Sequence, residues 1–183
     1  MVIVLAGIIP MVILEAVLLR SYERRAVNVR TAEIQNQCTI LCNRLGDLSY
    51  QQGGSSEIIR AELAQLSNIY NGRVMLISGE FRIVEDTYGM DTGKTIVSRD
   101  VIRCFKGNGT SHYDAGNRYI EVTAPIVGNA SGETEGVMLV SVSTDTIEDS
   151  LTVLEGRAKT LEVVACLILA ILAGLIGTGT VTP

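Results

Sequence analysis

Histidine and cysteine, the residues that most often bind metals or catalyse reactions, are few in this sequence. His112 is the only histidine, and beside Tyr113 and Asp114 it could titrate near neutral pH and sense acidity. A surface residue on a strand is the simpler interpretation. No second histidine or cysteine stands at a metal-ligand spacing from it. No nucleophile–base pair or paired carboxylates emerge either, so we expect no metal site, no cofactor and no catalytic residue.

Two further patterns come close to a binding or redox motif. The segment 89–95 resembles a phosphate-binding loop, but three residues separate Gly89 from Gly93 where that motif requires four, so we do not expect nucleotide binding. Cys38 and Cys42 are four residues apart on a predicted helix, which holds their β-carbons about 5–6 Å apart, too far for a disulfide. Packing in the core explains Cys38 better than a redox role.

The overall composition excludes several classes of protein. The chain has 183 residues, of which 47% are hydrophobic and 4% aromatic, with no tryptophan. This is not the composition of a disordered, collagen-like or disulfide-scaffold protein. A net charge of −5 and the shortage of aromatic side chains also argue against nucleic-acid binding.

The apolar residues are concentrated at the two ends of the chain. Residues 1–19 contain one charge, Glu15, and residues 163–183 contain none. A helix of about 20 apolar residues crosses the hydrocarbon core of a bilayer. We therefore expect transmembrane helices at residues 1–19 and, as part of an exit helix, within residues 156–181. A signal peptide is the alternative at the N-terminus, but a basic leader and a small-residue cleavage motif are lacking.

The charges beside these segments bear on the orientation of the central domain, residues 20–155. The basic residues flanking the segments all lie on the side of this domain, which the positive-inside rule would place in the cytoplasm. That rule applies to short loops, however, and a large domain crosses the membrane largely regardless of charge. The domain is also acidic, and we expect a cell-membrane protein with an extracytoplasmic central domain.

The central domain reads as two helices followed by short strands. A heptad pattern from Val27 to Leu48 predicts a long helix that ends near Tyr50. A second amphipathic helix follows, with its apolar positions at Ile58, Ile59, Leu63, Leu66 and Ile69. We then expect five strands and one short helix, at 73–78, 81–84, 96–105 (the helix), 110–114, 118–126 and 136–143. This order predicts an α+β domain with an antiparallel sheet and pairing between non-adjacent strands.

The end of the domain repeats the pattern of its beginning. Apolar residues from Ile147 to Leu161 keep the heptad spacing, which continues to Leu175. We expect one helix from the last strand through the membrane, weakened only at Gly156. Such a helix could transmit a displacement of the sheet across the bilayer, or it could serve only as an anchor.

Four segments in this order resemble a known module: Gly72–Ile77, Phe81–Asp86, Tyr119–Ile126 and Gly136–Ser143. The chain is similar to the extracytoplasmic PAS-like sensor module (single-Cache or PDC type) of bacterial two-component sensor histidine kinases. The resemblance implies a five-stranded antiparallel PAS-like sheet with a long N-terminal helix, flanked by two transmembrane helices. It also implies a HAMP linker and a kinase core after the second span, neither of which is present in this chain. The same module precedes chemoreceptor and cyclic-dinucleotide output domains.

The resemblance further implies a ligand pocket between the sheet and the segment that follows the first hairpin. The polar residues expected there are Arg82, Tyr88, Arg99, Arg103, Tyr119 and Glu121. An arginine with tyrosine neighbours suits a carboxylate ligand, because the guanidinium group offers two parallel donors. The acidic surface would also permit a cation or a cationic peptide.

The partners expected are a second copy of the chain, through the N-terminal helix and the spans, and a small-molecule or peptide ligand. A response regulator would be reached only through the missing kinase core, and no nucleic acid is expected. Two other interpretations stay open. One is a membrane-anchored interaction or assembly domain without an output, and the other is a membrane enzyme with its active site in residues 20–155.

Overall fold

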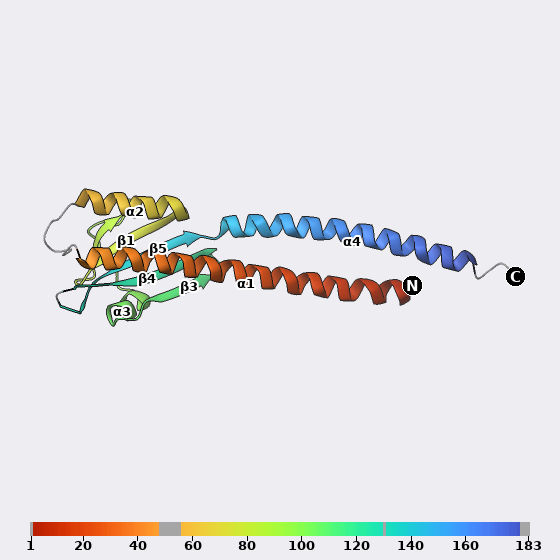
Figure 1. The fold of residues 1–183 in the computed structure, drawn as a ribbon, viewed down its shortest axis with the longest axis horizontal. Helices are drawn as coiled ribbons and strands as arrows, with labels where there is room; N and C mark the ends of the chain where they lie inside the picture. The colour runs from red at the N-terminus through yellow and green to blue at the C-terminus, as the bar shows by residue number, and fades with distance from the viewer. Residues whose placement is uncertain (1, 48–55, 130, 180–183) are drawn as a thin grey trace. The chain divides into compact units, whose positions relative to one another are not determined.

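The computed structural model describes residues 2–47, 56–129 and 131–179 (Figure 1). The chain divides into two compact units, Val27–Thr144 on the one hand and Met1–Ala26 with Asp145–Pro183 on the other. In chain order the elements are α1 (Val2–Asp47), α2 (Ser56–Tyr70), β1 (Gly72–Ser78), β2 (Ile83–Asp86), α3 (Arg99–Phe105), β3 (Thr110–Asp114), β4 (Tyr119–Val127), β5 (Thr134–Ser143) and α4 (Asp145–Gly179).

The unit Val27–Thr144 is built on one five-stranded sheet in the order β2-β1-β5-β4-β3. Every neighbouring pair is antiparallel. The first and last strands of the chain, β1 and β5, pair in the middle of the sheet, with Val74 opposite Val140. This confirms the predicted α+β class, the five-stranded PAS-like sheet and the pairing of non-adjacent strands.

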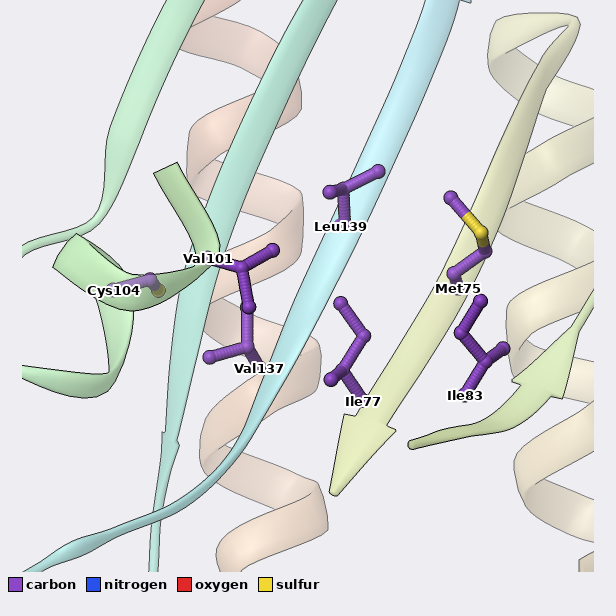
Figure 2. Close-up of a cluster of buried hydrophobic side chains, with 7 residues drawn as sticks. All are labelled: Met75, Ile77, Ile83, Val101, Cys104, Val137 and Leu139. Carbon is purple, nitrogen blue, oxygen red and sulfur yellow. The ribbon is translucent and has the colours of Figure 1, made fainter. Parts of the chain in front are cut away.

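The helices α1 and α2 cover one face of this sheet (Figure 2). The Sγ of Cys42 in α1 donates to the carbonyl oxygen of Ala124 in β4, at 3.8 Å. The heptad seam predicted for α1 is confirmed as far as the helix is described, because its apolar members are buried: Val27, Ile34, Cys38, Leu41 and Leu45. Leu48 and the predicted end near Tyr50 lie outside the described residues.

The buried face of α2 differs from the predicted one at two positions. Ile58 and Ile69 are 56% and 59% exposed, so they are not part of it. The residues that α2 buries are instead spaced by four, three and four: Ile59, Leu63, Leu66 and Tyr70. This spacing follows the 3.6-residue period of the helix more closely than the predicted set does.

The short helix α3 packs on the other face of the sheet (Figure 2). Its Val101 and Cys104 join a buried cluster with side chains of three strands: Met75, Ile77, Ile83, Val137 and Leu139. The sequence predicts a start at Ile96, but the helix begins at Arg99, because Ser98 has an extended backbone and caps the helix. The Ser98 hydroxyl accepts a hydrogen bond from the amide of Val101 at 3.2 Å.

The strand predicted at 81–84 is displaced by two residues, to Ile83–Asp86. Phe81 has a left-handed backbone, with φ of 60°, and its amide donates to the carbonyl of Ser78 at 2.9 Å. The turn after β1 therefore extends to Arg82. A bulky residue seldom adopts this conformation, which is why the apolar run alone predicted a strand there.

The other unit contains the beginning of α1 and all of α4. As predicted, α4 is continuous from Asp145, directly after β5, and it passes Gly156 without a break. Leu14, Leu18 and Tyr22 of α1 line one groove with Leu154 and Leu161 of α4. Judged on the described residues alone, the structure has no helix of sufficient length and apolarity to cross a membrane.

Candidate functional site

Four polar residues lie opposite one another across four strands of the sheet. Arg73 in β1 is opposite Ser141 in β5, Ser141 is opposite Glu121 in β4, and Glu121 is opposite His112 in β3. Directly opposite residues point to the same face, so these four form one polar row. Arg73 is two residues from Met75, and Ser141 is two from Leu139, so the polar row lies on the α3 face beside the buried cluster.

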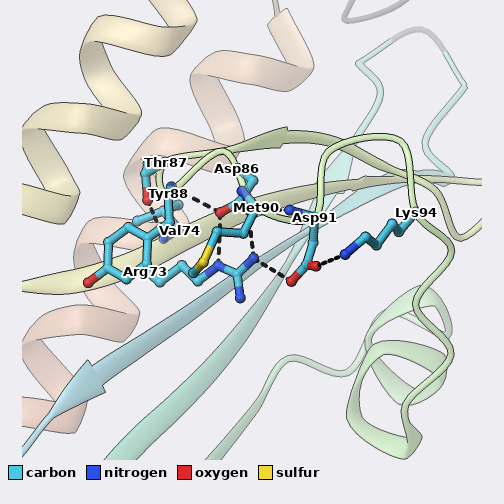
Figure 3. A network of polar contacts seen from close by, with 8 residues as sticks. All are labelled: Arg73, Val74, Asp86, Thr87, Tyr88, Met90, Asp91 and Lys94. Carbon is cyan, nitrogen blue, oxygen red and sulfur yellow. Dashed lines mark hydrogen bonds and ion pairs between the residues drawn. The ribbon is translucent and has the colours of Figure 1, made fainter.

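The first hairpin brings a buried carboxylate to one end of the polar row (Figure 3). Asp86, the last residue of β2, receives the Nε and Nη2 of Arg73 at 2.8 and 2.6 Å. The same carboxylate accepts the backbone amides of Tyr88, Met90 and Asp91 at 3.0–3.1 Å. Five donors thus converge on a side chain that is fully buried, and they fix both Arg73 and the turn after β2.

These contacts shift the acidity of both partners. The hydrogen bonds from Arg73, followed by those from the turn amides, hold the pKa of Asp86 well below its usual range, although burial opposes the shift. The pKa of Arg73 is raised, chiefly by the Asp86 carboxylate. The pair therefore stays ionised at every physiological pH.

The rest of this turn carries a second ion-pair system. Asp91 accepts the Nη2 of Arg73 at 2.6 Å and the Nζ of Lys94 at 2.6 Å. The Arg73 guanidinium also lies 5.9 Å from the centre of the Tyr88 ring, within reach of a cation–π contact. Gly89 and Gly93 adopt positive φ angles of 68° and 84°, which let the chain bend back twice within this turn.

The pKa of Glu121, in the middle of the polar row, is shifted in the opposite direction to that of Asp86. Its partial burial, together with the negative charge of Asp100 at the start of α3, raises the pKa of its carboxyl, and His112 partly offsets this. A carboxyl in this position gains from a proton or from a positively charged neighbour. The polar row therefore has a cationic end at Arg73 and an acidic part at Glu121.

A cavity lies on the other side of the same turn, against α2. It measures about 380 Å³, and Leu63 and Ala64 of α2 form part of its wall. An ion pair between Arg60 Nε and Glu85 Oε1, at 2.9 Å, lies beside it. Its size is in the range of small-molecule pockets. The turn after β2 thus contacts the Arg73 end of the polar row and also lines this cavity.

The structure brings three of the six predicted ligand residues to this region. Tyr119 and Glu121 lie on the α3 face of β4, opposite Ser143 and Ser141, and Tyr88 contacts Arg73. The other three are exposed and lie outside the polar row. Arg99 and Arg103 lie on α3, and the backbone of Arg82 bridges to Thr95.

Sequence reasoning missed the residues with the densest contacts: Arg73, Asp86, Asp91 and Lys94. A signal was available for the first of them. Arg73 is the only charge in the otherwise apolar strand Gly72–Ile77, and a charge in a buried strand needs a partner. Asp86 is followed by glycines at positions 89 and 93, a pattern typical of a tight turn held by a carboxylate.

The cysteines and the lone histidine do not form a chemical centre. Cys38, Cys42 and Cys104 are buried free thiols, and the burial of Cys38 agrees with the core packing expected for it. Burial raises the pKa of each thiol, so little of the reactive thiolate forms. His112 is exposed on the edge strand β3. In the described parts of the chain, no three His, Cys, Asp or Glu side chains could hold a metal ion.

Comparison with known proteins gives matches only at the level of structure. No protein-family model matches the sequence, and a search of curated protein sequences gives no significant match. The sensor domain of the V. cholerae histidine kinase DctB superposes with a TM-score of 0.58 and 17% identity, over 75% of this chain and 56% of that one. An extracellular ligand-binding receptor from Desulfohalobium retbaense gives a TM-score of 0.56 and 17% identity, over 70% of this chain and 25% of that one.

A chemoreceptor domain gives a third match. The ligand-binding domain of Campylobacter jejuni Tlp3, in complex with 4-methylisoleucine, has a TM-score of 0.53 and 15% identity, over 76% of this chain and 61% of that one. The chain thus spans less than two thirds of each of these three structures. At such low identity the likeness concerns the fold, and the fold of this chain is the PAS-like one found in extracytoplasmic sensor domains.

Proposed function

We propose that this chain is the signal-sensing and transmembrane-relay part of a bacterial sensor histidine kinase. Residues 20–155 would be the extracytoplasmic sensor domain, and residues 1–19 and 156–181 would contain the two transmembrane helices. The observation that carries the proposal is the turn after β2, which Asp86 holds rigidly between a polar sheet face and a cavity of about 380 Å³. A solute bound on either side of this turn would contact groups fixed to the sheet.

The ligand in this proposal is a small molecule with polar groups. Arg73 and Tyr88 offer a cationic and an aromatic surface, while Glu121 and Tyr119 offer acceptors on β4, which β5 separates from β1. A similar fold with a bound ligand supports a small molecule, since the structure of the Tlp3 domain is a complex with 4-methylisoleucine. The exposed Arg82, Arg99 and Arg103 would supply positive charge outside the polar row.

The relay would start at β5. Ser141 belongs to the polar row, and two residues further on Ser143 ends the strand. Thr144 follows, and its amide donates to the carbonyl of Arg118 at 2.8 Å before α4 begins at Asp145. A shift of β5 against β4 would therefore reach α4 through a single residue.

The signalling unit in this proposal is a homodimer. Val29 and Ile40 of α1 are 61% and 45% exposed, and Ile69 of α2 is 59% exposed. Ile40 and Ile69 border a groove of about 180 Å³ between the two helices. A second copy packed along α1 would cover these side chains, and the spans would continue the contact.

A chimera tests the function. The chain is joined after Pro183 to the HAMP linker and catalytic core of a bacterial sensor kinase, and autophosphorylation is measured in membranes. Ser141→Phe fills the polar row and is expected to change kinase output several-fold. Ser111→Phe is the control, because Ser111 is also a strand serine but is exposed and lies opposite Val122, on the α1 face. Equal output from both variants and the parent would contradict the proposal.

The coding DNA beyond Pro183 tests the kinase assignment separately. Histidine-kinase motifs downstream would agree with it, whereas a chemoreceptor signalling domain or a cyclic-dinucleotide enzyme would keep the sensor and change the output. A stop codon close to Pro183 would favour the membrane-anchored interaction domain.

A further inference from the structure

One carboxylate in the turn after β2 bridges two cations that are otherwise placed to receive an anion (Figure 3). Asp91 Oδ2 is 2.6 Å from Arg73 Nη2, and Asp91 Oδ1 is 2.6 Å from Lys94 Nζ. Its side chain is 33% exposed, and that of Lys94 is 66% exposed. Lys94 therefore faces solvent, the Arg73 side chain is 19% exposed, and the Asp91 carboxylate lies between the two cations.

The Asp91 carboxylate is not needed to keep Arg73 in place. Asp86 already binds Arg73 through Nε and Nη2, and its carboxylate is fully buried. The guanidinium would stay docked against Asp86 if Asp91 moved away. The side chains of Asp86 and Asp91 thus have different tasks, although both contact the same nitrogen.

The backbone of Asp91 is held independently of its side chain. Its amide donates to Asp86 Oδ2 at 3.0 Å, and its carbonyl accepts the amide of Lys94 at 3.0 Å. Rotation of the Asp91 side chain would break neither bond. Ion pairs as exposed as the one with Lys94 contribute little to stability, so release of this carboxylate sacrifices mainly its contact with Arg73 Nη2.

We propose that Arg73 and Lys94 form a binding site for the carboxylate group of a small solute, and that the Asp91 side chain occupies this site until the solute displaces it. The proposal rests on the proposed sensory function, and it adds that the Asp91 side chain competes with the solute for the site. The incoming carboxylate would accept from Arg73 Nη2 and Lys94 Nζ, in the same positions that the Asp91 oxygens hold. The ring of Tyr88, which contacts the guanidinium, would border the rest of the solute.

Chemical rescue tests this proposal, because acetate has the same carboxylate and methylene carbon as the Asp91 side chain. The full chain is prepared in nanodiscs with Asp91→Ala, and thermal unfolding is followed by circular dichroism at pH 7 and constant ionic strength. Acetate replaces chloride stepwise, and acetamide serves as the uncharged probe. We expect acetate to raise the unfolding midpoint of Asp91→Ala saturably, with half-saturation at least tenfold below that of the parent chain. Acetamide should have no effect.

Asp114→Ala is the matched control. Asp114 also holds a turn, and its carboxylate accepts from the backbone amides of Gly116 and Asn117 and from the side-chain amide of Asn117. Asp91→Asn is the second variant if Asp91→Ala does not fold, since the amide stays near Arg73 and Lys94 without the charge. Acetate should bind Asp91→Asn more tightly than the parent chain, and adding Lys94→Ala should weaken the rescue several-fold.

The outcomes separate this inference from the proposed function. If Asp91→Ala responds to acetate no more than Asp114→Ala or the parent does, the proposal that the Asp91 side chain occupies an anion site is wrong. That conclusion does not depend on the result of the kinase chimera. If acetate rescues Asp91→Ala but Ser141→Phe leaves the kinase output of the chimera unchanged, the anion site is supported and the proposed sensory function is contradicted.

Discussion

Arg73 and Asp86 form a bidentate ion pair that ties the second residue of β1 to the last residue of β2. The two residues are not opposite each other in the sheet, since Asp86 is the register partner of Met75. The Arg73 side chain therefore reaches diagonally to a carboxylate that three turn amides already surround. This diagonal contact makes the hairpin and the turn one rigid element.

Replacing Asp86 by asparagine should destabilise the central domain strongly. The substitution leaves Arg73 largely buried with only Asp91 as a counter-charge. It also replaces one acceptor oxygen by an NH2 group, a donor that would face the donors of Arg73 and of the turn amides. Breaking a buried ion pair in this way costs about 3 kcal/mol of unfolding free energy. Urea unfolding of the full chain measures it. Asp114→Asn, in an exposed turn, is the control and should lose much less; equal losses would contradict the central role of Asp86.

The same carboxyl should dominate acid unfolding. Because the pKa of Asp86 is lower in the folded state than in the unfolded chain, its contribution to stability is complete above the ordinary aspartate pKa of about 3.9. That contribution disappears as the pH falls through the lower, folded value. The parent chain should therefore lose stability more steeply below about pH 4 than Asp86→Asn does. Parallel stability curves for the two proteins would be inconsistent with this assignment.

Glu121→Gln should stabilise the central domain at neutral pH, whereas Asp86→Asn should destabilise it. Burial and the charge of Asp100 raise the pKa of this carboxyl in the folded state, so ionised Glu121 weakens the fold at neutral pH. The glutamine variant should be more stable than the parent at pH 7, and the difference should vanish below the ordinary glutamate pKa of about 4.3. Urea midpoints at both pH values measure this, and a variant less stable at pH 7 would refute it.

How far the sequence predicts these features depends on their origin. The seam from Val27 to Leu45 follows from apolar periodicity, and the strand Thr110–Asp114 follows from its place before the turn at 115–117; both appear as predicted. The start of β2 does not, because the left-handed Phe81 reflects its tertiary surroundings and not its residue type. The Arg73–Asp86 pair joins two strands through a diagonal contact. The spacing of apolar residues along the sequence does not predict such a contact.

Close approach of backbones is another feature invisible in the sequence, and Gly46 near the end of α1 gives a test. A β-carbon at Gly46 would overlap the carbonyl oxygen of Val127 at the end of β4. Gly46→Ala should therefore cost about 1–3 kcal/mol through overpacking, despite the better helix propensity of alanine. At Gly156 in α4 a β-carbon would meet nothing within 4 Å. Gly156→Ala should accordingly stabilise its helix by up to about 1 kcal/mol.

Thr144, the single residue between β5 and α4, tests the junction through which the proposed relay passes. It is 1% exposed, and within the described part of the chain its hydroxyl has no hydrogen-bond partner. A buried, unpaired hydroxyl costs about 1–3 kcal/mol, so Thr144→Val, which keeps the shape, should raise the unfolding free energy by about 1 kcal/mol. Thr123→Val is the control, because the hydroxyl of Thr123 contacts that of Thr110 at 2.8 Å and its loss should destabilise. If the hydroxyl of Thr144 finds a partner only in the signalling state, Thr144→Val should also hold the kinase chimera in its resting output. A destabilised Thr144→Val would mean that the hydroxyl is already satisfied, and the junction would then be an ordinary strand end.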